Sequence, residues 1–110
     1  MQVECRDSGD ATVVMARGSI GEMEADLLFK KFAEAFARNR HKIILDLTDV
    51  DLITSTGIGV IMTVYKTTRS HGGYIRIVNP QPLIRDVFVT TKLVKIIPIC
   101  ATLEEAQQQA

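Results

Sequence analysis

The 110-residue sequence contains no tryptophan, few prolines and only two cysteines, and its 13 basic residues balance its 13 acidic residues. A formal net charge of zero gives no electrostatic reason to expect binding to nucleic acid or to an anionic membrane. No apolar run approaches the ~20 residues that a membrane span requires, and the opening MQVECRDSGD lacks the basic start and apolar core of a signal peptide. We therefore expect a cytoplasmic protein, with residues 1–110 forming one domain.

The two cysteines, Cys5 and Cys100, lie near opposite ends of the chain and share no ligand-like spacing with each other or with His41 and His71. This arrangement predicts neither a metal site nor a disulfide. Both cysteines fall in segments typical of strands, so we expect two small buried apolar side chains.

Motifs for catalysis or for nucleotide binding are also missing. Gly57-Ile58-Gly59 could begin a dinucleotide loop, but Met62 stands where the third glycine would be, and neither GxxxxGK[ST] nor GxSxG occurs. The sequence predicts a protein that is not an enzyme and that needs no cofactor. Gly57 and Gly59 are instead predicted to let the first turn of a helix pack tightly on a sheet.

Hydrophobic periodicity predicts alternating strands and helices after an N-terminal hairpin. Leu28, Phe32 and Phe36 recur at every fourth position, which indicates an amphipathic helix beginning at a Ser19–Glu22 capping box or nearer Glu22. The predicted strands are the start of the chain with Val3 and Cys5, Ala11–Ala16, Lys42–Leu47, Tyr74–Val78 and Lys95–Ile99. The later helices are predicted from Thr56 to Ser70, from Pro82 with Leu83, Val87 and Phe88 facing inward, and after a Thr102–Glu105 capping box.

This order, β-β-α-β-α-β-α-β-α, predicts an α/β fold with a mostly parallel sheet covered by helices. Lys42–Leu47 is apolar enough to be its central strand, and Pro98 suggests an edge position for the last strand. The predicted core includes Ile44, Leu45, Phe32, Phe36, Ile61 and Val87.

Three adjacent hydroxyl residues, Thr54, Ser55 and Thr56, precede the second long helix. A hydroxyl at this position is a usual N-cap, and we expect Ser55 or Thr56 to fill that role. Capping explains only one of the three residues. A serine at a helix N-terminus also suits phosphorylation, because free N–H groups and the helix dipole favour the added negative charge.

The stretch ILDLTDVDLITSTGIGVIMTVYKTTRSHGG, from Ile44 to Gly73, and the later LVKIIPICATLEEA resemble the STAS domain of bacterial anti-sigma factor antagonists. The resemblance implies that Ser55, with Thr56 as the alternative, is phosphorylated by a GHKL-type kinase that is itself the anti-sigma factor. The unphosphorylated protein would bind this kinase and free a sigma factor, and a PP2C-type phosphatase would restore that form. Thr54 replaces the motif's aspartate, and Lys92 replaces a glycine common after the third helix.

Other STAS domains are constitutive docking subunits of transporters or other complexes, and this remains the alternative function. In either case the partner surface is expected where parallel strands end and helices begin. The sequence leaves the oligomeric state open. The residues predicted to form the partner surface are Ser19, Gly21, Glu22, Asp51, Thr54, Ser55, Thr56, Gly57 and Ile58.

Overall fold

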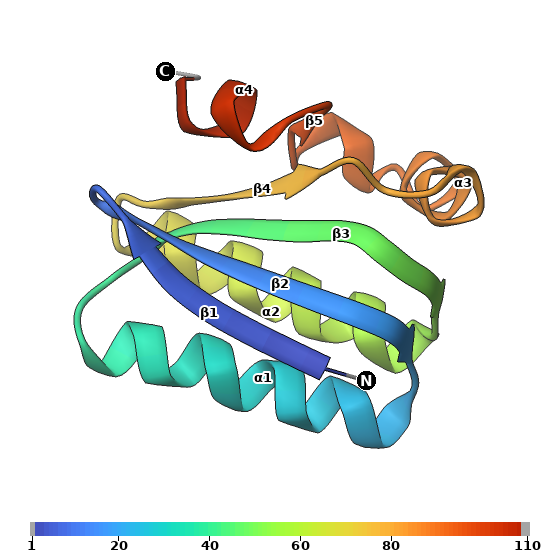
Figure 1. Cartoon of the computed structure of the whole chain (residues 1–110), viewed down its shortest axis with the longest axis horizontal. Helices are drawn as coiled ribbons and strands as arrows, with labels where there is room; N and C mark the ends of the chain where they lie inside the picture. The colour runs from blue at the N-terminus through green and yellow to red at the C-terminus, as the bar shows by residue number, and fades with distance from the viewer. Residues whose placement is uncertain (1, 109–110) are drawn as a thin grey trace.

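The computed structural model describes residues 2–108, which form one five-stranded sheet with four α-helices. The predicted order of strands and helices is confirmed (Figure 1). The elements are β1 (Gln2–Ser8), β2 (Ala11–Ile20), α1 (Glu22–Ala37), β3 (Lys42–Ile53), α2 (Ser55–Ser70), β4 (Tyr74–Val78), α3 (Pro82–Thr90), the 3-10 turn η1 (Leu93–Lys95), β5 (Ile99–Cys100) and α4 (Leu103–Gln108).

The strands lie in sequence order across the sheet, β1-β2-β3-β4-β5. β1 and β2 form the predicted antiparallel hairpin, and each later strand pairs in parallel with its neighbour. β3 is central, as predicted, but it continues six residues beyond Leu47, to Ile53. Its pairing with β2 contains two register shifts in that extension, between Met15 and Arg17 and between Gly18 and Ser19. The extension carries the carboxyl ends of β2 and β3 to the start of their helices.

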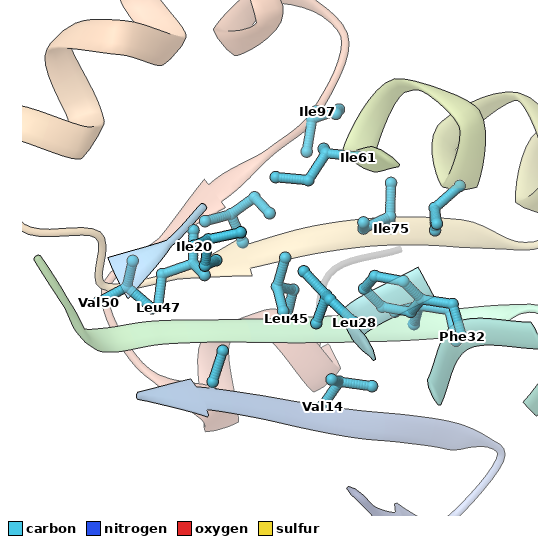
Figure 2. Close-up of a cluster of buried hydrophobic side chains, with 14 of the residues drawn as sticks. Val14, Ile20, Leu28, Phe32, Leu45, Leu47, Val50, Ile61, Ile75 and Ile97 are labelled. Atoms are coloured by element: carbon cyan, nitrogen blue, oxygen red, sulfur yellow. The ribbon is translucent and has the colours of Figure 1, made fainter. Parts of the chain in front are cut away.

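Helices cover both faces of the sheet unequally. α1 and α2 lie along one face (Figure 1), and their apolar side chains meet those of the strands in the large core cluster (Figure 2). The short α4 covers part of the other face in a smaller cluster with Ile44, Val78 and Cys100. The predicted core residues Ile44, Leu45, Phe32 and Ile61 are fully buried, and Phe36 packs against the core while half-buried.

The predicted inward face of α3 is partly wrong. Ile84 and Phe88 are buried, whereas Leu83 is 63% exposed and Val87 is only half-buried. α3 starts at Pro82, and the pair four residues apart that faces the sheet is Ile84–Phe88. Leu83 and Val87 form the next such pair, rotated by about 100° around the helix axis.

The predicted strand Lys95–Ile99 is also wrong in its position. Lys92 adopts a left-handed conformation with φ of 63°, and the chain then makes the turn η1 and enters β5 only at Ile99. Pro98 has no N–H to give to a strand ladder, which places the short β5 after it. β5 is an edge strand, as Pro98 suggested.

The prediction of two buried cysteines is confirmed for Cys100 but wrong for Cys5, whose residue is exposed. Cys5 lies on β1, the other edge of the sheet, where only one neighbouring strand covers it. Both thiols are free. At the final helix, Thr102 Oγ1 accepts a hydrogen bond from the Glu105 N–H at 3.1 Å, so the predicted cap is confirmed.

Residues 2–108 contain neither a membrane-spanning helix nor a cluster of metal-ligating side chains. None of their helices is long and apolar enough to cross a membrane. Nor do these residues bring together three histidine, cysteine, aspartate or glutamate side chains in a group that could hold a metal ion.

Candidate functional site

The predicted site residues gather where β2 and β3 end and where α1 and α2 begin, at the right of Figure 1. Each strand is joined to its helix by a single residue, Gly21 after β2 and Thr54 after β3. The two connections are tied together, because the Thr54 N–H donates to the Ile20 carbonyl at 3.0 Å. We call this region the carboxyl end of the sheet.

The N-cap of α2 is Thr54, and the prediction that Ser55 or Thr56 caps the helix is wrong. Thr54 has extended backbone angles, φ −88° and ψ 170°, and its Oγ1 accepts a hydrogen bond from the Gly57 N–H at 3.4 Å. Its carbonyl accepts from the Ile58 N–H at 3.0 Å. A threonine at the position of the motif's aspartate therefore still supplies a capping oxygen. Ser55 and Thr56 are left as the first two helical residues, and both are exposed.

Gly57 holds the first turn of α2 close to the sheet, as predicted. A Cβ on Gly57 would lie 2.8 Å from Ile53 Cγ1 and 2.9 Å from Ile20 Cγ2, which is too close for ordinary packing. The same prediction is wrong for Gly59, where a Cβ would meet nothing within 4 Å. The contact at Gly57 fixes the position of the neighbouring Ser55 and Thr56 relative to the two strands.

The acidic residues that precede Ser55 in the sequence lie at the end of β3 and not in the helix. The first turn of α2 contains no acidic residue. Asp51 accepts a hydrogen bond from Ser19 Oγ at 2.8 Å, and Asp49 lies 3.6 Å from Arg17 Nε in an exposed ion pair. Ser19 is therefore a β2 residue that orients Asp51, and it takes no part in capping α1.

The start of α1 follows the alternative that the sequence left open, with Gly21 as the N-cap and Glu22 as the first helical residue. The Gly21 N–H donates to Glu24 Oε1 at 3.1 Å, so the acidic partner of the cap is Glu24. Glu22 is exposed at the carboxyl end. Ile58, in the first turn of α2, is half-buried against the core.

A set of exposed apolar side chains at this end was not predicted from the sequence. Met23 is 81% exposed at the start of α1, Leu52 is 48% exposed at the end of β3, and Leu83 is 63% exposed at the start of α3. α1 follows β2, Leu52 lies at the end of β3, and α3 follows β4, so the three side chains lie at the ends of neighbouring strands. Met23 lies outside the buried stripe of α1, and this mismatch with the helical period is the signal that could have identified it. Leu83 gives no such signal, because it forms a regular four-residue pair with Val87.

Comparison with known proteins matches residues 2–106 to the STAS domain family. A Thermotoga maritima protein named "putative anti-sigma factor antagonist" is 33% identical over 102 residues, which cover 91% of this chain and 90% of that protein. A crystal structure with the same description from that organism has a TM-score of 0.91 at 30% identity, covering 96% of this chain and 92% of the other.

The fold is also that of the Bacillus cell fate determinant SpoIIAA in its phosphorylated form, with a TM-score of 0.78 at 20% identity over 96% of each chain. The relatives by sequence are anti-sigma factor antagonists, which are regulatory binding proteins, and this confirms the prediction of a protein that is not an enzyme. The resemblance found in the sequence is confirmed, and the chain belongs to the STAS domain family.

Proposed function

We propose that this protein is an anti-sigma factor antagonist whose binding is switched by phosphorylation of Ser55. In its unphosphorylated form it binds a GHKL-type kinase that is itself the anti-sigma factor, and it thereby frees a sigma factor in the cytoplasm. A PP2C-type phosphatase returns the phosphorylated protein to the binding form. The single observation that carries this proposal is the placement of Ser55, exposed as the first residue of α2 and not used as its cap.

The proposed phosphate meets a helix end that tolerates negative charge. Thr54 uses its own hydroxyl and carbonyl for the N–H groups of Gly57 and Ile58. The N–H groups of Ser55 and Thr56 have no hydrogen-bond partner among the contacts of residues 2–108. These two groups and the helix dipole favour an anion at this position, so we expect the fold to survive phosphorylation.

The binding surface responds differently from the fold. Phosphorylation adds about −1.5 to −2 charges to the end of the sheet where Asp51 accepts a hydrogen bond from Ser19 and Asp49 pairs with Arg17. A partner that covers Ser55 must desolvate this charge, and acidic groups of the partner would be repelled by it. We therefore expect the interface to fail while α2 stays in place.

The proposed partner surface consists of Ser19, Gly21, Glu22, Asp51 and the stretch from Thr54 to Ile58. The exposed Met23, Leu52 and Leu83 add apolar anchors around these polar groups. A mixed surface of this kind, apolar side chains beside hydrogen-bonding groups, is typical of regulated protein–protein contacts.

The test is to incubate the protein with ATP and its cognate GHKL-type kinase, and to locate the phosphate by mass spectrometry. We expect modification of Ser55, its loss in Ser55→Ala and its retention in Thr56→Ala. The reverse pattern would move the switch to Thr56. If neither residue is modified and the kinase binds the wild type and Ser55→Glu equally, the proposal is contradicted and the constitutive docking role is favoured.

A further inference from the structure

The two edges of the sheet differ in their capacity to accept another strand. β5 is only two residues long and follows Pro98, so it offers almost no ladder. β1 is the other outer strand (Figure 1). It is seven residues long, contains no proline and pairs with β2 without a register shift. Edge strands are usually protected by prolines, bulges or charged side chains. β1 has no proline and no bulge, and its charged residues are Glu4, Arg6 and Asp7.

The free hydrogen-bonding groups of β1 follow from its hairpin. Gly9 and Asp10 form a two-residue turn between the paired Ser8 and Ala11, and Gly9 has the positive φ, 61°, that such turns require. Pairs that exchange hydrogen bonds then alternate along the hairpin from Ser8–Ala11. Glu4 and Arg6 exchange bonds with β2, whereas the backbone groups of Val3, Cys5 and Asp7 point away from it, toward the open edge.

The side chains of β1 are complementary to a second copy of β1. When two such strands pair in antiparallel fashion about a two-fold axis at Cys5, Glu4 lies opposite Arg6 of the second copy and Arg6 lies opposite Glu4 of the second copy. Glu4 and Arg6 are exposed, and neither has an ion-pair partner within residues 2–108. Opposite charges directly across an antiparallel pair stabilise it.

The remaining charge on this strand does not oppose the pairing. Asp7 is held within its own chain by Arg38, at 2.8 Å, and by Arg40, at 3.2 Å. In the two-fold register Asp7 lies opposite Val3 of the second copy and not opposite another acidic residue. Of the acidic residues on β1, only Glu4 therefore needs a partner, and the second copy supplies one.

We propose that β1 is a homodimer interface, in which two copies pair their β1 strands in antiparallel fashion about Cys5 and join their sheets into one. The occupant of this edge is a second copy because the charge pattern of the strand is complementary to itself. A two-fold contact of this kind closes after two subunits and leaves no further β1 edge exposed.

The test is sedimentation velocity over a concentration series with Glu4→Arg, Arg6→Glu and the double swap Glu4→Arg/Arg6→Glu. Each single variant replaces both attractive pairs of the dimer with repulsive pairs, and we expect dimerisation to weaken at least about tenfold. The double swap restores opposite charges and should restore dimerisation. Because both side chains are exposed, circular dichroism should show that all variants fold like the parent protein.

A short bis-maleimide provides a second readout in the unmodified protein. Cys5 lies on the proposed axis, so two copies should be linked through it, and Cys5→Ser should abolish the link. Cys100 is buried and is the internal control. A protein that stays monomeric throughout, or a dimer that neither single charge reversal weakens, would overturn the proposal.

Discussion

The two ends of the sheet use their polar side chains in different ways. At the amino end, left in Figure 1, Arg40 donates to Thr12 Oγ1 at 2.8 Å and to the carbonyls of Gly9 and Ala11 at 3.0 and 2.8 Å. At the carboxyl end the hydroxyls of Ser55 and Thr56 are exposed, and the side chains of β2 and β3 are linked there by Ser19–Asp51 and by the exposed ion pair Arg17–Asp49. Polar side chains at the amino end therefore hold loops together, whereas the hydroxyls of Ser55 and Thr56 at the carboxyl end are exposed to solvent.

Aromatic packing strengthens this difference. Phe36, His41 and His71 form a stack at the amino end, with ring centroids 5.1 and 4.0 Å apart and rings nearly parallel. The stack joins the end of α1 to the end of α2. At the carboxyl end, large apolar side chains such as Met23 and Leu83 are exposed instead. The difference is that the ends of α1 and α2 at the amino end of the sheet are joined by packed side chains, whereas their starts keep exposed polar and apolar side chains, which the proposed function would use for recognition.

The largest effect on stability is expected in the core that both ends share. Phe32 is fully buried between α1 and the sheet (Figure 2). Phe32→Ala should lower the free energy of unfolding by about 3–5 kcal/mol, because it removes apolar contacts and leaves a cavity. Urea denaturation measures this loss, and a value below about 1 kcal/mol would show that the core is wrongly assigned.

The next largest effect on stability is expected at the amino end, and it can be compared directly with a substitution at the carboxyl end. A Cβ on Gly73 would lie 1.8 Å from the backbone oxygen of His41, so the loops of the amino end would have to move apart. We expect Gly73→Ala to cost about 3 kcal/mol, the upper part of the usual range for overpacking. Ser55→Ala at the carboxyl end should change stability by less than about 0.5 kcal/mol. Equal losses of unfolding free energy in Gly73→Ala and Ser55→Ala would contradict the difference described between the two ends.

A smaller effect concerns the one position of the α2 start that is tightly packed. Gly57→Ala should cost about 1–2 kcal/mol, because the new Cβ meets Ile20 and Ile53. Gly59→Ala is the matched control, since its Cβ enters open space and alanine favours a helix over glycine by about 1 kcal/mol. Thermal unfolding of both variants tests the pair. A loss at Gly59 as large as that at Gly57 would contradict the packing described for this turn.

The smallest effect is a pH dependence at the amino end. Burial, and secondarily the neighbouring His71, lower the pKa of His41 below its ordinary value of 6.5. The unfolded chain therefore binds the proton more readily, so stability should fall as pH drops through about 6.5 and level off below the folded pKa. His41→Phe keeps a flat ring for the stack and should lose this component. If the free energy of unfolding changes with pH in the same way for the wild type and His41→Phe, from pH 8 to about 5, then His41 is not the source of this pH dependence.

Much of the fold could be predicted because strands and helices alternate with clear periods. The central position of Lys42–Leu47 follows from its continuous apolar run, which suits a strand covered on both faces. The errors lie where a local conformation decides the outcome. Lys92 adopts a left-handed conformation without being glycine, and the turn after it replaces most of the predicted last strand.

The candidate site was predicted as a region but not in its internal roles. The end of the sheet follows from parallel topology, which brings Ser19 and Asp51 together from positions 32 residues apart. The identity of the cap does not follow, because Thr54, Ser55 and Thr56 all have hydroxyls and only the backbone angles distinguish them. Nor could the sequence distinguish Gly57 from Gly59, since their difference depends on which side of the turn faces the strands.

The most direct test of the switch places the same charge at the two ends of α2. Ser55 and Ser70 are the first and last residues of this helix, and both are exposed. Titration calorimetry with the cognate kinase would compare the wild type, Ser55→Glu, Ser70→Glu and the protein phosphorylated at Ser55. We predict about a hundredfold loss of affinity on phosphorylation, about tenfold for Ser55→Glu and almost none for Ser70→Glu. Equal affinity of all four forms for the kinase would contradict the claim that Ser55 is the switch.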